Sequence, residues 1–257
     1  MTYRNIVVER DGDYVTITMN RPEKRNSLSL DHMLELTEAF RATGEGDALG
    51  VILAANGPVF SAGHDFADMA GADLPAMRRL FQVCTGMMDT MQSIPQVVIA
   101  RVHALATAAG CQLVATADLA VAAESAQFAT PGGKGGLFCH TPMVAIARNV
   151  GRKRALEMAM TGDPIDARTA AEWGLVNRVV PLEDLEGETL ALLRRATRGS
   201  PFAKAVGKQA FYAQVDLDQP KAYAHAIEVM AAGTQTHDGQ EGITSFLQKR
   251  PPSWERR

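Results

Sequence analysis

Two apolar runs of strand length, each followed by a turn of small residues and a helical pattern, constrain the fold most. The runs span residues 50–54 and 97–102, and helical patterns follow over 74–94 and 108–116. A third apolar run covers 118–123. Continuous apolar runs suit strands buried on both faces, and helical crossovers join parallel strands. The order therefore predicts an α/β fold, in which ligands bind where strand ends meet helix N-termini.

The flanking segments complete this outline. Residues 3–9 and 13–19 are rich in strand-forming residues and flank an Asp-Gly turn, so they predict a hairpin. Ser29 is a suitable N-cap for a helix over 31–41. Beyond residue 136 one strand is expected, over 175–180. The expected helices there cover residues 142–150, 152–160, 167–173, 182–198, 201–214, 220–235 and 238–249. The Gly-Ser-Pro sequence at 199–201 stops one helix and starts another, which predicts two parts, residues 1–199 and 200–257.

Composition excludes several classes of protein. The formal net charge of −3, spread along 257 residues, gives no electrostatic reason to expect nucleic acid or an anionic membrane as a partner. No apolar run approaches the 18 residues that a membrane span requires. The three cysteines, Cys84, Cys111 and Cys139, are scattered and form no CxxC pair, so neither a disulfide framework nor a metal site is expected. We therefore expect a cytoplasmic protein.

Two turns of small residues are candidates for chemistry. They span residues 60–65 and 105–112, and each follows the end of a predicted strand. Backbone N–H groups at a helix N-terminus are unsatisfied and attract negative charge, so such turns can hold an oxyanion. Small residues at these positions also permit close packing of helices, which is the alternative interpretation.

Several ordered motifs resemble the enoyl-CoA hydratase/isomerase (crotonase) superfamily over nearly the whole chain. The matching segments are Asn20-Arg21-Pro22 with Asn26-Ser27-Leu28, Phe60-Ser61-Ala62-Gly63-His64-Asp65, Gly110-Cys111-Gln112-Leu113 with Asp118, residues 156–162, residues 174–181 and residues 246–250. Residues 106–113 and 136–139 resemble in particular the subgroup of enoyl-CoA hydratase domain-containing proteins.

The resemblance implies a ββα spiral core, a C-terminal helical region that builds a trimer or a dimer of trimers, and an acyl-CoA thioester ligand. It also implies two backbone N–H donors that stabilise a thioester enolate, at His64 and Ala109. Asp65 is expected to tie down the loop that carries His64. No separate cofactor is implied, because coenzyme A belongs to the substrate. Its expected contacts are Lys24, Arg25, Ala62, Asp65, Phe246 and Lys249, with the last two reaching a neighbouring subunit's ligand.

The chain departs from this family where two glutamates usually move protons. Gln112 and Gly132 occupy these positions. An amide holds water but cannot take its proton, and glycine has no side chain. Loss of general acid–base help costs about 10²- to 10⁴-fold per group, so ordinary hydration is expected to be severely weakened. Substituting glutamate at both positions is expected to raise hydratase activity.

Two nearby side chains are candidate replacements. Histidine side chains carry protons in many active sites, so His140 is a candidate acid or base, and Cys139 is a candidate nucleophile. Core packing by Cys139 and helix capping by His140 are the alternatives. Three functions follow: an enolate-stabilising lyase or isomerase, a noncatalytic acyl-CoA binder, and a thioester hydrolase that uses Cys139.

Overall fold

The computed structural model describes residues 3–255 and contains a six-stranded sheet in the order β1-β2-β3-β4-β6-β9. The hairpin of β1 and β2 is antiparallel, and every later neighbour in this sheet is parallel. These strands are Ile6–Asp11, Tyr14–Met19, Gly50–Ala55, Val97–Val102, Leu119–Ala123 and Arg178–Val180. The structure confirms the predicted α/β class and the parallel crossovers.

Helices cover both faces of this sheet, which explains the continuous apolar runs. Within β3, Val51 and Leu53 belong to the larger core, whereas Ile52 and Ala54 pack with Leu193 of α7 on the opposite face. The helices are α1 Leu30–Gly44, α2 Leu74–Ser93, α3 Ala109–Thr116, α4 His140–Val150, α5 Arg152–Thr161, α6 Ala167–Trp173, α7 Leu185–Ala196, α8 Pro201–Gln214, α9 Gln219–Thr234 and α10 His237–Leu247. Short 3₁₀ turns span Pro22–Lys24, Phe66–Asp68, Pro131–Gly135 and Leu182–Asp184.

A second, three-stranded sheet was not predicted. It consists of β5 Ala106–Thr107, β7 Gln127–Ala129 and β8 Ile165–Asp166, in that order. Strands of two or three residues have too little alternation to be detected from sequence. The strand expected over 175–180 is also shorter, because the N–H groups of Leu175 and Val176 complete the end of α6 by donating to the Ala170 carbonyl.

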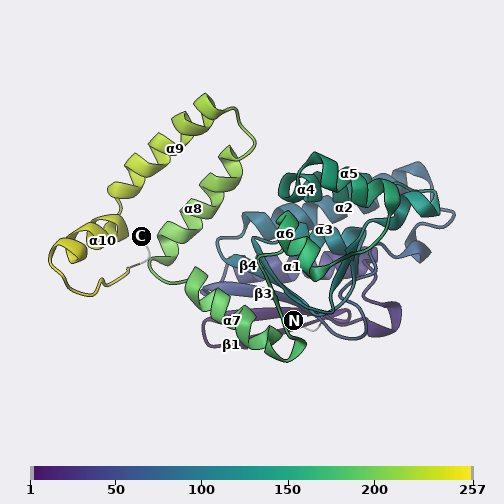
Figure 1. The fold of residues 1–257 in the computed structure, drawn as a ribbon. Coiled ribbons are helices and arrows are strands. Elements are labelled where there is room, and N and C mark those ends of the chain that lie inside the picture. Colours follow the sequence, from purple (N-terminus) through teal and green to yellow (C-terminus); the bar gives the residue numbers. More distant parts are fainter. Residues whose placement is uncertain (1–2, 256–257) are drawn as a thin grey trace.

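The three C-terminal helices form an arm that extends away from the sheet (Figure 1). Gly199 adopts a positive φ of 94°, Ser200 caps α8 and Pro201 begins it, so the chain turns where the Gly-Ser-Pro sequence predicts a boundary. Neither α8 nor α9 has a buried residue. Across residues 3–255, no helix combines the length and apolar character that a membrane span needs.

Candidate active site

Backbone pairing brings the two predicted turns together at the ends of neighbouring strands. Ser61 forms a parallel bridge with Ala106, and the Thr107 N–H donates to the Ser61 carbonyl at 2.9 Å. Leu28 forms a second parallel bridge with His64. The loop that carries His64 is therefore held between the Leu28 segment and the start of α3.

The Leu28 bridge directs the His64 N–H away from the pairing edge. Leu28 donates to the Gly63 carbonyl at 2.8 Å, and Asp65 donates to the Leu28 carbonyl at 3.1 Å. In a parallel ladder the residue between these two bonds presents its own N–H on the other side. No hydrogen bond from the His64 N–H occurs among residues 3–255. This N–H is thus available to a ligand.

The second predicted donor lies at the first position of α3. Ala109 follows Ala108, which adopts φ 51° and ψ −118°, a conformation that strains a residue with a side chain. The Ala108 N–H donates to the Ala129 carbonyl at 2.9 Å, which fixes this turn to the second sheet. The N–H of a first helical residue has no partner within its helix. Ala109 therefore presents a donor at the helix N-terminus.

Two glycines allow the donors to approach each other. A Cβ atom on Gly63 would lie 3.2 Å from the Ala109 nitrogen and 2.9 Å from the Ala108 Cβ. A Cβ atom on Gly110 would lie 2.5 Å from the Ser61 carbonyl oxygen. The loop and the helix thus touch through positions that have no side chain. The segment that carries His64 therefore packs directly against the segment that carries Ala109.

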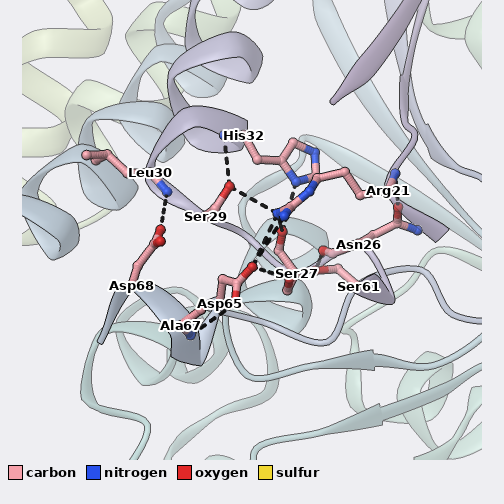
Figure 2. A network of polar contacts seen from close by, with 10 residues as sticks. All are labelled: Arg21, Asn26, Ser27, Ser29, Leu30, His32, Ser61, Asp65, Ala67 and Asp68. Atoms are coloured by element: carbon pink, nitrogen blue, oxygen red, sulfur yellow. Dashed lines mark hydrogen bonds and ion pairs between the residues drawn. The ribbon is translucent and has the colours of Figure 1, made fainter. Parts of the chain in front are cut away.

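A polar network holds the loop that carries His64 and Asp65 (Figure 2). The Asp65 carboxylate accepts from the Ser27 hydroxyl at 2.9 Å and from the Ala67 N–H at 3.1 Å, and it pairs with Arg21 at 3.4 Å. Burial acts to raise the pKa of Asp65, but these hydrogen bonds and the Arg21 charge together hold it below its ordinary value. Asp65 thus ties down the loop as expected. Its side chain is 16% exposed, and its expected contact with coenzyme A stays a prediction.

We expect Asp65→Asn to lower the free energy of unfolding by about 2 kcal/mol at pH 7, because hydrogen bonds to a charged group are worth about 1.5–3 kcal/mol. The pKa of Asp65 is depressed by folding, so its contribution is present above the unfolded pKa and disappears as pH falls through the folded value. Urea unfolding at pH 7 and pH 3 measures both effects. Asp216→Asn, which removes an exposed pair with Arg148, should change stability by less than about 1 kcal/mol. Equal losses in the two variants would contradict a special role for Asp65.

Asn26 joins three segments around this loop, a role that sequence reasoning missed. It is fully buried at φ 50°. Its amide donates to the carbonyls of Asn56 and Val59 at 2.7 and 3.0 Å, and its side-chain oxygen accepts from the Arg21 N–H at 2.8 Å. The sequence did hold one signal for this role. Asparagine tolerates a positive φ, and Asn26 stands directly before a Ser-Leu pair.

The two positions at which the motifs predict replaced glutamates differ in their surroundings. Gln112 is 5% exposed, and its Oε1 atom has no hydrogen-bond partner within the described chain. Gly132 lies in the 3₁₀ turn, where its carbonyl accepts from the Leu137 N–H at 2.9 Å. A Cβ atom on Gly132 would collide with the Leu137 carbonyl oxygen and lie 2.7 Å from Cys139 Sγ. A glutamate at position 132 therefore requires this turn to shift, and the expected rise in hydratase activity stays a prediction.

The candidate replacement side chains occupy different environments. The His140 ring is exposed and packs on Phe138, with 5.0 Å between ring centroids. Cys139 is 8% exposed, and burial raises the pKa of its thiol although the Gly132 N–H opposes this effect. A raised thiol pKa weakens the case for a nucleophile. The His64 ring packs edge-on against Phe81, and burial lowers its pKa to about 4, so this imidazole is neutral near pH 7.

The expected coenzyme A contacts fall into two groups. Lys24 and Arg25 are exposed beside the loop, since the Arg25 carbonyl accepts from the Ala62 N–H at 3.0 Å. Phe246 and Lys249 lie at the end of the C-terminal arm, and Phe246 is 82% exposed. One chain does not bring the two groups together.

A cavity of about 540 Å³ lies elsewhere, between the core and α8. Lys208 of α8 crosses to the core, where it pairs with Asp118 at 2.8 Å and donates to the Gln96 carbonyl at 2.8 Å. The Tyr212 hydroxyl also donates to Asp118, at 2.7 Å. Neither predicted turn lines this cavity. The network fastens α8 to the sheet, and it gives Asp118 a structural role that sequence reasoning did not assign.

The mostly parallel sheet, the second small sheet and the helical arm agree with the crotonase fold expected from the motifs. The chain belongs to the enoyl-CoA hydratase/isomerase family, whose model matches residues 9–257. It is 45% identical over 252 residues to zebrafish (Danio rerio) "Enoyl-CoA hydratase domain-containing protein 3, mitochondrial", covering 96% of this chain and 86% of that protein. The family and the subgroup expected from the motifs are thereby confirmed.

Solved structures agree with this assignment. An enoyl-CoA hydratase from Mycobacterium smegmatis superposes with a TM-score of 0.95 at 44% identity, covering 98% of this chain and 99% of that one. Human enoyl coenzyme A hydratase domain-containing protein 3 superposes with a TM-score of 0.94 at 42% identity, covering 98% and 100%. The names of the zebrafish and human proteins correct one expectation: relatives 45% and 44% identical to this chain are mitochondrial, so the cytoplasmic prediction is wrong.

Proposed function

We propose that this protein binds an acyl-CoA thioester and stabilises its enolate through the N–H groups of His64 and Ala109. The observation that supports the proposal is a pair of backbone N–H groups that have no hydrogen-bond partner among residues 3–255, on two segments that touch at Gly63 and Gly110. Donors fixed by folding stabilise a developing oxyanion without reorganisation, and one such donor is worth about 3–4 kcal/mol. Membership of the enoyl-CoA hydratase/isomerase family supports the thioester as the ligand.

The proposed reaction is lyase or isomerase chemistry of the enolate rather than ordinary hydration. Gln112 can orient a water molecule but cannot accept its proton, and the turn at Gly132 leaves no room for a side chain. The same absence of carboxylates favours a second candidate, a protein that binds thioesters without turning them over. Turnover distinguishes the two functions.

Coenzyme A enters as part of the substrate. We assign its phosphates to Lys24 and Arg25, because both side chains are exposed and the Arg25 backbone is bonded to the donor loop. Two phosphate contacts in water are worth about 1 kcal/mol each, so replacing both residues by alanine should weaken binding by about tenfold or more. Arg152 and Lys153, an exposed basic pair on α5, provide the matched double-alanine control.

The deciding experiment is calorimetry with a panel of saturated and unsaturated acyl-CoA thioesters and free coenzyme A. We expect thioesters to bind more tightly than free coenzyme A, because only they place a carbonyl oxygen between the two donors. Mass spectrometry of the same mixtures then detects turnover. Absence of binding by every thioester would refute the proposal, and binding without turnover of any thioester would favour the noncatalytic candidate.

We also propose a homotrimer or homohexamer built through the C-terminal arm. Tyr223, Ile227 and Met230 are each at least 60% exposed and lie at helical spacing on one side of α9. Such a stripe on a helix without buried residues is typical of a surface that another chain covers. This assembly would also carry Phe246 and Lys249 to a neighbouring subunit's ligand.

Sedimentation velocity tests this assembly. We expect a mass three or six times the 27.6 kDa of one chain. Placing aspartate at both Ile227 and Met230 should dissociate it, because two charges would be buried without partners. Matched aspartates at the exposed polar positions Lys221 and Glu228 should leave the mass unchanged. A monomeric wild-type protein would refute the proposal.

A further inference from the structure

The thiol of Cys139 occupies the space in which a side chain at position 132 would begin. A Cβ atom on Gly132 would lie 2.7 Å from Cys139 Sγ, and the Gly132 N–H donates to this sulfur. Position 132 is where the family resemblance places one of the two proton-carrying glutamates. The sulfur thus lies at the start of that missing side chain.

Buried polar atoms without partners also occur on the neighbouring elements. Gln112 is only 5% exposed, yet its Oε1 atom has no hydrogen-bond partner in the part of the chain that the structure describes. It lies three residues after Ala109, on the same side of α3 as that donor. The buried hydroxyls of Thr107 and Thr130 lack partners as well. Unsatisfied polar groups are rare in folded proteins and are found where a ligand or water completes them.

Among the side chains around position 132, that of Cys139 is the best candidate to give and accept a proton. The amide of Gln112 and the two hydroxyls do not change charge near neutral pH. The neighbouring Cys111 is fully buried, and burial raises its thiol pKa. His64 is held neutral, and His140 is exposed beside Phe138. Cys139 retains 8% exposure at the start of α4.

We propose that Cys139 transfers a proton to and from the carbon atom next to the thioester carbonyl, in place of the missing glutamate. This inference rests on the proposed function, because it requires a thioester between the His64 and Ala109 donors. Thiols protonate carbon well, since they are much stronger acids than the carbon acid of a thioester. The role differs from nucleophilic attack and forms no acyl–sulfur bond.

The exchange step balances without a further reactant. The Cys139 thiolate removes a proton from the α-carbon, so a C–H bond breaks and an S–H bond forms. The electron pair of the C–H bond moves to the carbonyl oxygen, which becomes the enolate held by the two N–H groups. The thiol then exchanges its proton with solvent, and the reverse step returns a solvent proton to carbon. Burial raises the pKa of the thiol, so the thiolate that begins each cycle forms by loss of the thiol proton to solvent.

Deuterium wash-in tests the inference. The full-length protein is incubated in D₂O with the saturated acyl-CoA that binds most tightly in the calorimetric panel, and α-deuteration is followed by NMR. We expect wash-in by the wild type and a loss of at least about 100-fold in Cys139→Ala and Cys139→Ser, the range for removal of one acid–base group. Both variants should keep wild-type thioester affinity. Cys84→Ala, which alters a buried cysteine of the α2 core, should exchange like the wild type.

The outcomes separate this inference from the proposed function. If the wild type binds the thioester but exchanges no α-proton, the role of Cys139 is refuted and thioester binding stands. If the Cys139 variants bind and exchange as fast as the wild type, another group moves the proton and the inference is wrong. If no thioester binds, the proposed function fails and this inference fails with it.

Discussion

Gly110→Ala should lower the free energy of unfolding by about 2 kcal/mol and any turnover of a thioester by about 10²- to 10³-fold. The new Cβ atom would lie 2.5 Å from the Ser61 carbonyl oxygen and 2.7 Å from the Ser61 Cβ. Overpacking of this kind typically costs about 1–3 kcal/mol. Relief of the contact requires the His64 loop to move away from α3, which separates the two donors. Loss of one donor accounts for the expected fall in rate.

The matched control is Gly86→Ala. Gly86 also lies inside a helix, α2, but a Cβ atom there has no neighbour within 4 Å. Alanine is favoured over glycine in a helix interior by about 0.8–1 kcal/mol, so this variant should be more stable than the wild type. Urea unfolding gives the free energy of unfolding of each variant. Calorimetry with the thioester that binds most tightly measures whether each variant still binds it. A stable Gly110→Ala variant with wild-type turnover would show that the contact with Ser61 does not position the donors.

The sequence predicted those parts of the fold that local patterns decide. Ser29 was expected to cap a helix, and its hydroxyl accepts from the His32 N–H at the start of α1. The apolar run in β3 was expected to be buried on both faces, and Ile52 and Leu53 do belong to opposite cores. The turns of small residues lie in contact, because close approach of two backbones requires residues without large side chains.

Contacts between distant segments could not be predicted in the same way. The Arg21–Asp65 pair joins residues 44 positions apart, and Asn26 binds carbonyls 30 and 33 positions away. Nothing local in the sequence specifies such partners, since many charged and amide residues compete for them. The position of Cys139 is a further case. It depends on the turn after Pro131, which is closed by the hydrogen bond from the Leu137 N–H to the Gly132 carbonyl. The motif resemblance predicted a replaced glutamate at position 132 but gave no indication of what lies beside it.

Combining Gln112→Glu with Gly132→Glu should fail to create an efficient hydratase, contrary to the expectation from the sequence alone. The Cβ atom of residue 132 would collide with the Leu137 carbonyl oxygen, which belongs to the backbone and cannot rotate aside. The hydrogen bond between Leu137 and Gly132 would then be lost, and Cys139 would be displaced. We expect Gly132→Glu alone to lower the free energy of unfolding by about 3 kcal/mol, the upper part of the range for overpacking.

Gly135→Glu is the control that separates charge and helix-forming tendency from this steric effect. Gly135 ends the same 3₁₀ turn, is exposed and has open space where a Cβ atom would lie. Surface substitutions of this kind usually change stability by less than about 0.5 kcal/mol. Urea unfolding of the two variants gives the difference, and an enoyl-CoA hydration assay reports the double variant. If Gly132→Glu is as stable as Gly135→Glu and the double variant hydrates enoyl-CoA rapidly, the turn opens at little cost. Cys139 would then stand in for a glutamate that the fold could still accommodate, and the absence of that glutamate would reflect the reaction rather than the space.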